Sequence, residues 1–361
     1  MHLLVFNLAT DAQHPLLGFT TLWLNKLAEK VASIQVITMQ AGVLQLHDNI
    51  QVYSLGKELG YSEPHRAVRF YRFLFEILRR QPIDLCFSHM TPLFTNLAAP
   101  ILKMHRIPIV TWYAHPSLTN RLKLAHFWSD RMLTSFPTTY PYRHDQKLVV
   151  VGQGIDTDLF RPATVTENSP EKALILAVGR LSPVKDYGTL IAAVAQLVGQ
   201  FPSSLSVLIV GNPTNDQDQQ YVTSLRAQVR QLHLEHVVRF QPAVSLQELP
   251  AIYQQCTVHV NLTPTGFGDK VALEAMACGK VCLVANPGFR ETLGMYADQL
   301  LFAHANPQDL AQKLQAVLAL PATERQAIGG YLRQQVVRLH SLDRLTDHLV
   351  HLFAELCAAK R

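Results

Sequence analysis

Two basic residues, Arg180 and Lys185, follow the apolar run ALILAVG, where a buried strand would give way to a helix. Ser182 and Pro183 between them suit the N-cap and the first position of that helix. Cations at a helix N-terminus oppose the helix dipole, but they would neutralise the charge of a diphosphate leaving group bound there. The alternative is a pair of solvated cations, with Asp186 partly compensating Lys185.

A glycine-containing loop, TPTGFG, follows a second apolar run and precedes a short helix that we expect to begin near Asp269. Gly266 and Gly268 can adopt backbone conformations that other residues avoid, and they let a ligand approach the main chain closely. The amides of this loop, with Phe267 between the two glycines, are therefore candidates for holding a phosphate or a sugar.

Glu274 lies in the middle of that helix, among the apolar residues of LEAMA. A carboxylate at this position could accept hydrogen bonds from both vicinal hydroxyls of a ribose. The alternative is an ion pair with Lys270, one helical turn earlier. A lysine that precedes a glutamate by four residues is the weaker orientation of such a pair, so this alternative explains little.

Histidines stand at or just after the ends of apolar runs in the first half of the chain. His115 follows IPIVTWY, His89 ends IDLCFSH, and His14 lies with Gly18 in the loop DAQHPLLGF. Ligands of open α/β sheets bind beyond the carboxyl ends of the strands, so these residues are candidates for contacting a substrate. For each histidine the alternative is a side chain satisfied within the fold, and Gly18 could simply begin a helix.

The segment EPHRAVRFYRFLFEILRRQ (63–81) predicts a helix with arginines beside aromatic residues. Arg66, Arg69 and Arg72 are spaced by three residues, next to phenylalanines of the same turns. Such a face could lie on an anionic membrane surface. The alternative is a helix that covers a sheet and turns its arginines to water.

The elements that must position these residues follow a repeating order, in which short apolar runs alternate with stretches of helical periodicity. The runs are mostly continuous rather than alternating in polarity, which is typical of strands buried on both faces of a parallel sheet. The intervening segments are mostly long enough for helical crossovers, so the sequence predicts two doubly wound α/β domains. The runs cover residues 2–8, 34–39, 50–55, 83–89, 107–113, 131–135 and 147–151 in the first half, and 173–179, 205–211, 236–240, 256–262, 280–285 and 299–302 in the second.

A polar stretch with prolines, RPATVTENSPEK (161–172), separates the two halves and is the candidate linker. We expect an N-terminal domain over residues 1–160 and a C-terminal domain over residues 161–341. Residues after about 320 are expected to be helical, with a break near Leu339–Ser341.

The composition excludes several classes of protein. Of the 361 residues, 48% are hydrophobic and only 16% are charged, which excludes a disordered chain. The net charge of +5 permits acidic ligands or an anionic surface, but we find no basic aromatic patch suited to nucleic acid. Five cysteines without a CxxC pair indicate buried thiols in a reducing compartment. The sequence has no HExxH-type metal spacing, no apolar run of the ~18 residues that a membrane span needs, and no signal-peptide pattern.

Several of these segments together resemble the GT4-type retaining glycosyltransferases of the GT-B fold. The resemblance is strong over about residues 150–300. Before residue 150 it extends only to the layout of the strands, the first loop glycine and the two strand-end histidines. It is carried by VGQGIDTDLFRP (151–162), AVGRLSPVKDYGTLI (177–191), VVRFQPAVSLQELPAIYQQCTVHVNLTP (237–264) and GFGDKVALEAMACGKVCLVA (266–285).

The family implies two Rossmann-like domains that face each other across a cleft, with a nucleotide-sugar donor bound mainly by the C-terminal domain. Its final helix usually crosses back to the first domain, which would place residues of about 342–361 there. No metal or cofactor is expected, because cationic side chains do the electrostatic work. The resemblance implies that Arg180 and Lys185 hold the donor diphosphate, Glu274 binds the ribose, the backbone from Gln241 to Val244 frames the base, His115 contacts the donor sugar, and Gly18 lies beneath the phosphate.

One position departs from the family pattern. The family usually carries two glutamates separated by seven residues, and the residue eight positions before Glu274 is Gly266. The first glutamate normally contacts the donor sugar, so Asp269 or Lys270 would have to replace it, or the amides of Gly266–Gly268 would act alone. We expect the missing glutamate to affect which donor sugar is recognised more than it affects binding of the nucleotide.

We therefore expect a metal-independent retaining transfer of a sugar from a UDP- or GDP-sugar to a glycan, lipid-linked or small-molecule acceptor, with His14 and His89 on the acceptor side. The alternatives are a sugar-nucleotide hydrolase or epimerase on the same fold, and a non-catalytic protein that binds sugar nucleotides or glycans. The expected location is the cytoplasm, with a peripheral contact at the inner face of an anionic membrane left open.

Overall fold

The computed structural model describes residues 1–361 except 15–16, 164–172, 200–204, 265, 267–268 and 360–361. The chain forms two compact units. Unit 1 comprises Met1–Gly154 and Leu342–Arg361, and unit 2 comprises Ile155–Ser341. Most of the candidate linker 161–172 lies outside the described residues, as do two candidate loop residues, Phe267 and Gly268.

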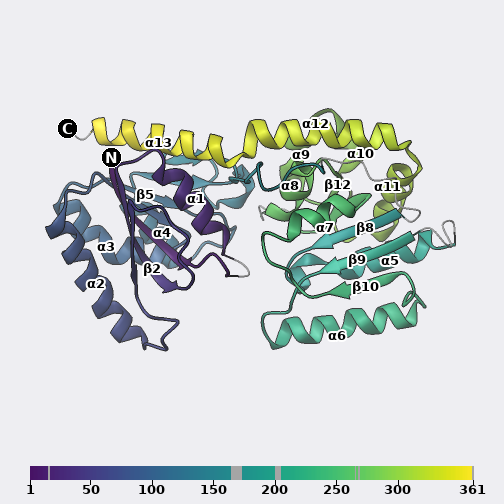
Figure 1. Cartoon of the computed structure of the whole chain (residues 1–361). Coiled ribbons are helices and arrows are strands. Elements are labelled where there is room, and N and C mark those ends of the chain that lie inside the picture. The colour runs from purple at the N-terminus through teal and green to yellow at the C-terminus, as the bar shows by residue number, and fades with distance from the viewer. Residues whose placement is uncertain (15–16, 164–172, 200–204, 265, 267–268, 360–361) are drawn as a thin grey trace. The chain divides into compact units, whose positions relative to one another are not determined.

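Unit 1 is built on a seven-stranded parallel sheet with the strand order β3-β2-β1-β4-β5-β6-β7 (Figure 1). The order reverses between β1 and β4, as in doubly wound folds. The strands are β1 (His2–Thr10), β2 (Ser33–Ala41), β3 (Ile50–Ser54), β4 (Leu85–His89), β5 (Ile109–Trp112), β6 (Arg131–Thr134) and β7 (Leu148–Val150). The helices are α1 (Phe19–Ala28), α2 (Glu63–Arg80), α3 (Pro92–Met104), α4 (Asn120–Trp128) and α13 (Leu342–Ala358), with a 3-10 turn at Pro137–Thr139.

Strand β1 shows why continuous apolar runs indicate two covered faces. Leu3 and Val5 belong to one core, which α1 and α13 close, whereas Leu4 and Phe6 belong to a second core under α2 and α3. Because neighbouring side chains of a strand point to opposite faces, a strand covered on both faces carries consecutive apolar residues, as residues 3–6 do here.

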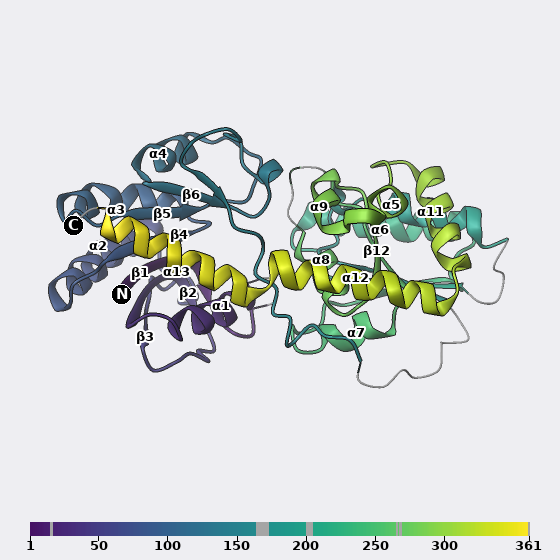
Figure 2. The same cartoon turned by 90° about the horizontal axis from the view of Figure 1, so that it is seen from above.

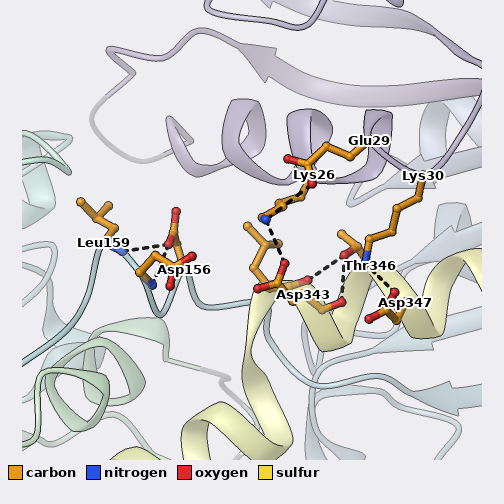
Figure 3. A network of polar contacts seen from close by, with 10 residues as sticks. Lys26, Glu29, Lys30, Asp156, Leu159, Asp343, Thr346 and Asp347 are labelled. Atoms are coloured by element: carbon orange, nitrogen blue, oxygen red, sulfur yellow. Dashed lines mark hydrogen bonds and ion pairs between the residues drawn. The ribbon is translucent and has the colours of Figure 1, made fainter.

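Helix α13 belongs to unit 1 although it follows unit 2 in the chain. Its apolar residues, among them Leu349 and Phe353, are buried with those of α1 in the same core. At its edge, Lys26 of α1 pairs with Asp343 at 3.0 Å, and Lys30, two residues after α1, pairs with Asp347 (Figure 3). The helical segment after residue 320 breaks at Ser341, within the range predicted for the break.

Unit 2 contains a five-stranded parallel sheet with the order β10-β9-β8-β11-β12. The helices α5 and α11 pack together, and α8 packs against α12 (Figure 2). The strands are β8 (Ala173–Val178), β9 (Leu205–Val210), β10 (Val238–Gln241), β11 (Val258–Asn261) and β12 (Val281–Val284). The helices are α5 (Tyr187–Leu197), α6 (Asp216–Gln231), α7 (Leu249–Gln255), α8 (Lys270–Ala277), α9 (Arg290–Leu293), α10 (Ala297–Leu300), α11 (Pro307–Ala319) and α12 (Ala322–His340), with 3-10 turns at Pro183–Lys185, Pro287–Phe289 and Gly294–Tyr296.

One predicted strand is wrong. The run QLLF (299–302) falls at the end of the short helix α10, and only a single bridge between Val284 and Leu301 attaches it to the sheet. An apolar run of four residues fits a buried helical turn as well as a strand, so periodicity cannot separate the two.

The five cysteines are all free, and four of them are buried as expected, while Cys357 is half-buried.

Candidate functional site

The carboxyl edge of the unit 2 sheet brings together two loops that are distant in the sequence. Strand β8 lies between β9 and β11, so the order of the strands reverses beside it. The loop after β8 carries Arg180 and Lys185, and the loop after β11 carries Gly266 and Asp269. Such a reversal is where open α/β sheets bind ligands.

Two glycines make this edge possible. A Cβ on Gly211 would lie 1.9 Å from the carbonyl oxygen of Gly179, so the ends of β8 and β9 approach too closely for any other residue there. Gly179 has a φ of +145°, and a Cβ on it would meet the Tyr187 hydroxyl at 3.1 Å and Cε of Lys185 at 3.4 Å. The absent side chain of Gly179 therefore leaves room for the Lys185 and Tyr187 side chains.

The helix after β8 begins later than the sequence suggests. Pro183–Lys185 form a 3-10 turn, and Ser182 makes no side-chain cap. Asp186 takes a left-handed conformation with φ of +45°, and α5 begins after it at Tyr187. Lys185 therefore ends a separate turn instead of standing in the first turn of α5.

Lys185 is bound inside the protein by Asp269. Its Nζ contacts Oδ2 of Asp269 and lies 3.3 Å from Oγ1 of Thr263, and the side chain is only 17% exposed. The same Asp269 oxygen accepts hydrogen bonds from Nδ2 of Asn261 at 2.7 Å and from Oγ1 of Thr263 at 2.5 Å. The counter-ion of Lys185 is thus Asp269 and not Asp186, so the alternative of a solvated lysine is wrong.

These contacts keep Asp269 ionised. Burial alone would raise the pKa of its carboxyl, but the charge and hydrogen bond of Lys185, with the hydrogen bonds from Thr263 and Asn261, outweigh burial and lower that pKa below its ordinary value. A cation and two further donors therefore hold a negative charge at the loop after β11.

Arg180 is held much more loosely. Its Nε lies 3.8 Å from Oδ2 of Asp218, and 42% of its side chain is exposed. Asp218 stands at the start of α6 and also accepts hydrogen bonds from the backbone and hydroxyl groups of Thr214, at 3.0 and 2.7 Å. The two cations of this edge are thus in different states, one exposed and one enclosed.

Glu274 is buried in α8, where its Oε2 accepts a hydrogen bond of 2.9 Å from the hydroxyl of Tyr253 on α7. Burial raises the pKa of Glu274 to about 7, and the Tyr253 hydrogen bond and the charge of Lys270 only partly oppose that rise. Burial likewise lowers the pKa of Lys270 to about 8. Lys270 therefore does act on Glu274 electrostatically, as the alternative proposed, and Tyr253 is a partner that the sequence did not reveal.

Two further residues of the predicted donor site are described. Gly266 is buried with a φ of +97°, a conformation that favours glycine. Val244 is half-buried in the loop after β10, where the neighbouring amide of Ala243 donates to Oδ1 of Asn212 at 3.1 Å. No role for either is decided by these contacts.

His259, which the sequence did not single out, is fully buried on β11. Among the described residues, neither ring nitrogen of His259 has a hydrogen-bond partner. Burial lowers the pKa of His259 to about 4, although Asp269 opposes that shift. The ring is therefore neutral at neutral pH, beside the pair formed by Lys185 and Asp269.

In unit 1, His14 and Gly18 form one local turn after β1. The amide of Gly18 donates to the carbonyl of His14 at 2.9 Å, and Nδ1 of His14 accepts from the amide of Leu17 at 3.1 Å. Gly18 has an ordinary right-handed conformation and precedes α1, so it begins a helix as the alternative held. A Cβ on it would nevertheless lie only 3.0 Å from the carbonyl oxygens of Ala12 and His14.

His89 at the end of β4 lies among aromatic rings. Its ring centroid is 5.0 Å from that of Trp23 and 5.6 Å from that of Trp112, with Phe19 at 6.3 Å. These packing contacts position the His89 ring at the carboxyl end of β4.

His115 follows β5 in the adjoining loop. Its Nδ1 accepts a hydrogen bond from the amide of Ser117 at 3.1 Å, and partial burial lowers the pKa of the ring. The neutral ring then carries its proton on Nε2, so that atom can act as a hydrogen-bond donor.

The arginines of α2 differ in their surroundings. Arg66 donates to the carbonyl of Tyr61, and Arg69 donates to the carbonyl of Ser54 at 2.9 Å and lies over the ring of Phe73. The expectation that both arginines face outward with Arg72 is therefore wrong. The exposed stripe of α2 consists instead of Val68, Arg72, Phe75 and Arg79, which share one helix face at spacings of four and three.

Within the described part of the chain, no group of three or more His, Cys, Asp or Glu side chains is placed to hold a metal ion. No helix there is both long and apolar enough to cross a membrane.

Comparison with known proteins places this geometry in a family. Residues 161–335, which include the whole edge described above, match the model of the glycosyl transferases group 1. Residues 161–335 of this chain are therefore similar to this family. Among the curated relatives of the chain, the D-inositol 3-phosphate glycosyltransferases of Frankia alni and Saccharomonospora viridis are each 32% identical to it, over 182 and 221 residues. The alignments cover 48% and 58% of this chain and 44% and 51% of the relatives, so the chain spans about half the length of the curated relatives it matches.

Solved structures show a likeness in fold over nearly the whole chain. The Anabaena protein HepE, solved in complex with UDP and glucose, superposes with a TM-score of 0.78 at 18% identity and covers 98% of this chain and 100% of its own. A sucrose-phosphate synthase from Thermosynechococcus elongatus superposes with a TM-score of 0.80 at 18% identity, covering 99% of this chain and 100% of its own. The fold is therefore GT-B, with two Rossmann-like domains, as predicted.

Proposed function

We propose that this chain transfers a sugar from a nucleoside-diphosphate sugar to an acceptor hydroxyl, and that unit 2 binds the donor. The observation that carries the proposal is the placement of Arg180 and Lys185 beside the reversal of strand order, between the loops after β8 and β11. Two cations at that edge suit the diphosphate of a donor, whose charge increases as it leaves.

Glu274 is the proposed ligand of the ribose. Its Oε2 is already held by Tyr253, so the carboxylate is oriented before a ligand arrives. A ribose that donates from its hydroxyls would favour the ionised form and lower the raised pKa of this carboxyl. Val244 and the amides near Gly266 would contact the base and the phosphate or sugar respectively.

The proposed reaction keeps the anomeric configuration. The bond between the anomeric carbon and the phosphate oxygen breaks, the acceptor oxygen attacks from the same face, and the acceptor proton passes to the departing phosphate. Arg180 and Lys185 would stabilise the charge that develops on that phosphate, so we propose that no metal ion is required. Neutral His115 would donate a hydrogen bond to the donor sugar from Nε2.

The relatives and neighbours suggest which substrates to test first. HepE has been solved with UDP and glucose, and a further structure of it contains UDP-glucose, which favours a UDP-sugar over a GDP-sugar. The curated relatives are named for D-inositol 3-phosphate, which makes a phosphorylated cyclitol the first acceptor to test. Glycan and lipid-linked acceptors follow, with His14 and His89 as the proposed acceptor-side residues.

One observation keeps a second function open. Gly266 occupies the position eight residues before Glu274, so a side chain that the family uses for the donor sugar is missing. A protein that binds sugar nucleotides without transferring sugar would tolerate this loss. Such a protein would bind UDP-glucose but release no UDP with any acceptor.

A peripheral contact with anionic lipid is the remaining part of the proposal. It rests on the exposed stripe of α2, in which Val68 is 69% and Phe75 is 49% exposed beside Arg72 and Arg79. An apolar and basic helix face of this kind suits the surface of an anionic bilayer.

Calorimetry and a transfer assay test the proposal together. UDP and GDP are titrated into the full chain, and UDP-glucose is then incubated with and without inositol phosphate while UDP release is followed. We expect UDP binding, acceptor-dependent release, an α-linked product by NMR, and full activity with EDTA. Acceptor-independent release would indicate a hydrolase, and binding without any release would indicate the non-catalytic alternative.

A further inference from the structure

Lys185 is engaged before any donor arrives, although the proposed function requires it for the diphosphate. Its Nζ contacts Asp269, which stands 84 residues later in the chain, and both side chains are largely enclosed, at 17% and 12% exposure. A phosphate that approaches this edge therefore meets a lysine whose charge is already neutralised.

Asp269 does not depend on Lys185 to stay in place. Asn261 at 2.7 Å and Thr263 at 2.5 Å donate to the same carboxylate oxygen, and both residues come from β11 or the residues directly after it. If the lysine leaves, these two donors still satisfy the carboxylate. Lysine is a flexible four-carbon side chain with a single charged tip, so it is the member of the pair that can move.

Arg180 shows that such enclosure is not a general property of this edge. It lies 3.8 Å from its carboxylate partner and is 42% exposed, so its guanidinium is available to a ligand as it stands. A ligand must therefore displace the Asp269 carboxylate to reach Lys185, whereas Arg180 is already exposed to it.

We propose that Asp269 acts as an internal competitor for Lys185, so that binding of the donor diphosphate exchanges the carboxylate for a phosphate at the lysine. The inference rests on the proposed function, and it adds a residue that regulates how tightly the same site binds the donor diphosphate. Asp269 is then a positioning residue: it places the ammonium group at the edge of the sheet and makes an anion compete for it.

The exchange makes affinity for anions depend on the charge of Asp269. Removing that charge while keeping the shape, as in Asp269→Asn, should raise the affinity for UDP and for inorganic pyrophosphate about tenfold, because an opposing charge in contact with the lysine is lost. Uridine lacks the diphosphate, so its affinity should not change. Asp269→Glu keeps the charge and should bind pyrophosphate within about threefold of the wild type.

The test is a double-mutant cycle measured by calorimetry on the full chain with UDP, uridine and pyrophosphate. Lys185→Ala is combined with Asp269→Asn, and the gain from Asp269→Asn should vanish when Lys185 is absent. Asp298→Asn is the matched control, because it removes one acid from an exposed ion pair with Arg290 in the same unit and should change no affinity. Asp269→Ser replaces Asp269→Asn if circular dichroism shows that the latter is unfolded.

The outcomes separate this inference from the proposed function. If pyrophosphate binds more tightly to Asp269→Asn only when Lys185 is present, but UDP binds to no variant, the proposal of a nucleotide donor is refuted. The competition between Asp269 and an anion for Lys185 is then still supported. Unchanged or weaker pyrophosphate binding in a folded Asp269→Asn protein would overturn the inference. A gain that persists without Lys185, or no anion binding to any variant, would overturn it as well.

Discussion

The hydroxyl of Tyr253 donates a 2.9 Å hydrogen bond to Oε2 of Glu274, and both side chains are buried. The bond joins α7 to α8 and orients the carboxylate without neutralising it. Burial raises the pKa of Glu274 to about 7, so the fold holds a carboxyl that is easily protonated at physiological pH. A group that carries an energetic cost when charged is a candidate for function.

Glu274→Gln should stabilise the fold at pH 8 and change it little at pH 5. Because the folded pKa of about 7 lies above the ordinary value of 4.5, the stabilising contribution of this group is complete below pH 4.5 and is lost as the pH rises through about 7. The glutamine amide stays neutral at every pH, so its contribution to stability does not fall as the pH rises. Urea unfolding of both proteins at pH 5 and pH 8 measures the difference, and an equal difference at the two values would contradict the expectation.

Lys185→Ala and Arg180→Ala should each lower turnover about a hundredfold while changing uridine binding little. Charge on the leaving group is greatest in the transition state, so the cations act mainly on the rate. Initial rates of UDP release and calorimetry with uridine give the two quantities. The control is Arg290→Ala, which removes a cation from an exposed ion pair of the same unit and should leave the rate unchanged.

His259→Leu should protect the protein against acid. The folded pKa of about 4 lies below the ordinary value of 6.5, so the stability that the neutral ring contributes is present above pH 6.5 and is lost as the pH falls toward 4. The leucine of the variant has no group that takes up a proton at this buried position. Its free energy of unfolding, relative to the wild type, should therefore increase between pH 7 and pH 5, and a constant difference would show that His259 does not titrate in this range.

Arg72→Gln combined with Arg79→Gln should weaken sedimentation with anionic vesicles at low salt. Each arginine near an anionic surface contributes about 1 kcal/mol, so losing two should reduce partitioning roughly thirtyfold. High salt should have a similar effect on the wild type, and neutral vesicles should bind neither protein. Arg230→Gln with Arg239→Gln, two exposed arginines of unit 2, is the control. A wild type that stays in the supernatant with every lipid would refute the membrane contact.

The fold class could be predicted because burial on both faces leaves a direct mark on the sequence. Strand β1 needs apolar residues at Leu3 and Leu4 alike, since α1 and α13 cover one face and α2 and α3 cover the other. The four-residue run at 299–302 carried too little periodicity, and its first two residues are the end of helix α10.

The candidate site was less accessible from the sequence. Lys185 and Glu274 could be singled out from their types and their places near strand ends. Their partners, Asp269 and Tyr253, could not be paired with them, because each contact joins residues far apart in the chain. The tryptophan rings around His89 could not be predicted for the same reason, since they come from other elements.

Unit 1 is discontinuous, and this has a consequence for its synthesis. Its core includes Leu345, Leu349 and Phe353 of α13, which the ribosome makes only after all of unit 2. While unit 2 emerges, the apolar surface of α1 and of one sheet face has no α13 to cover it. The part of the protein that is translated first is therefore completed last, and during that interval it is the part most exposed to aggregation and to chaperones.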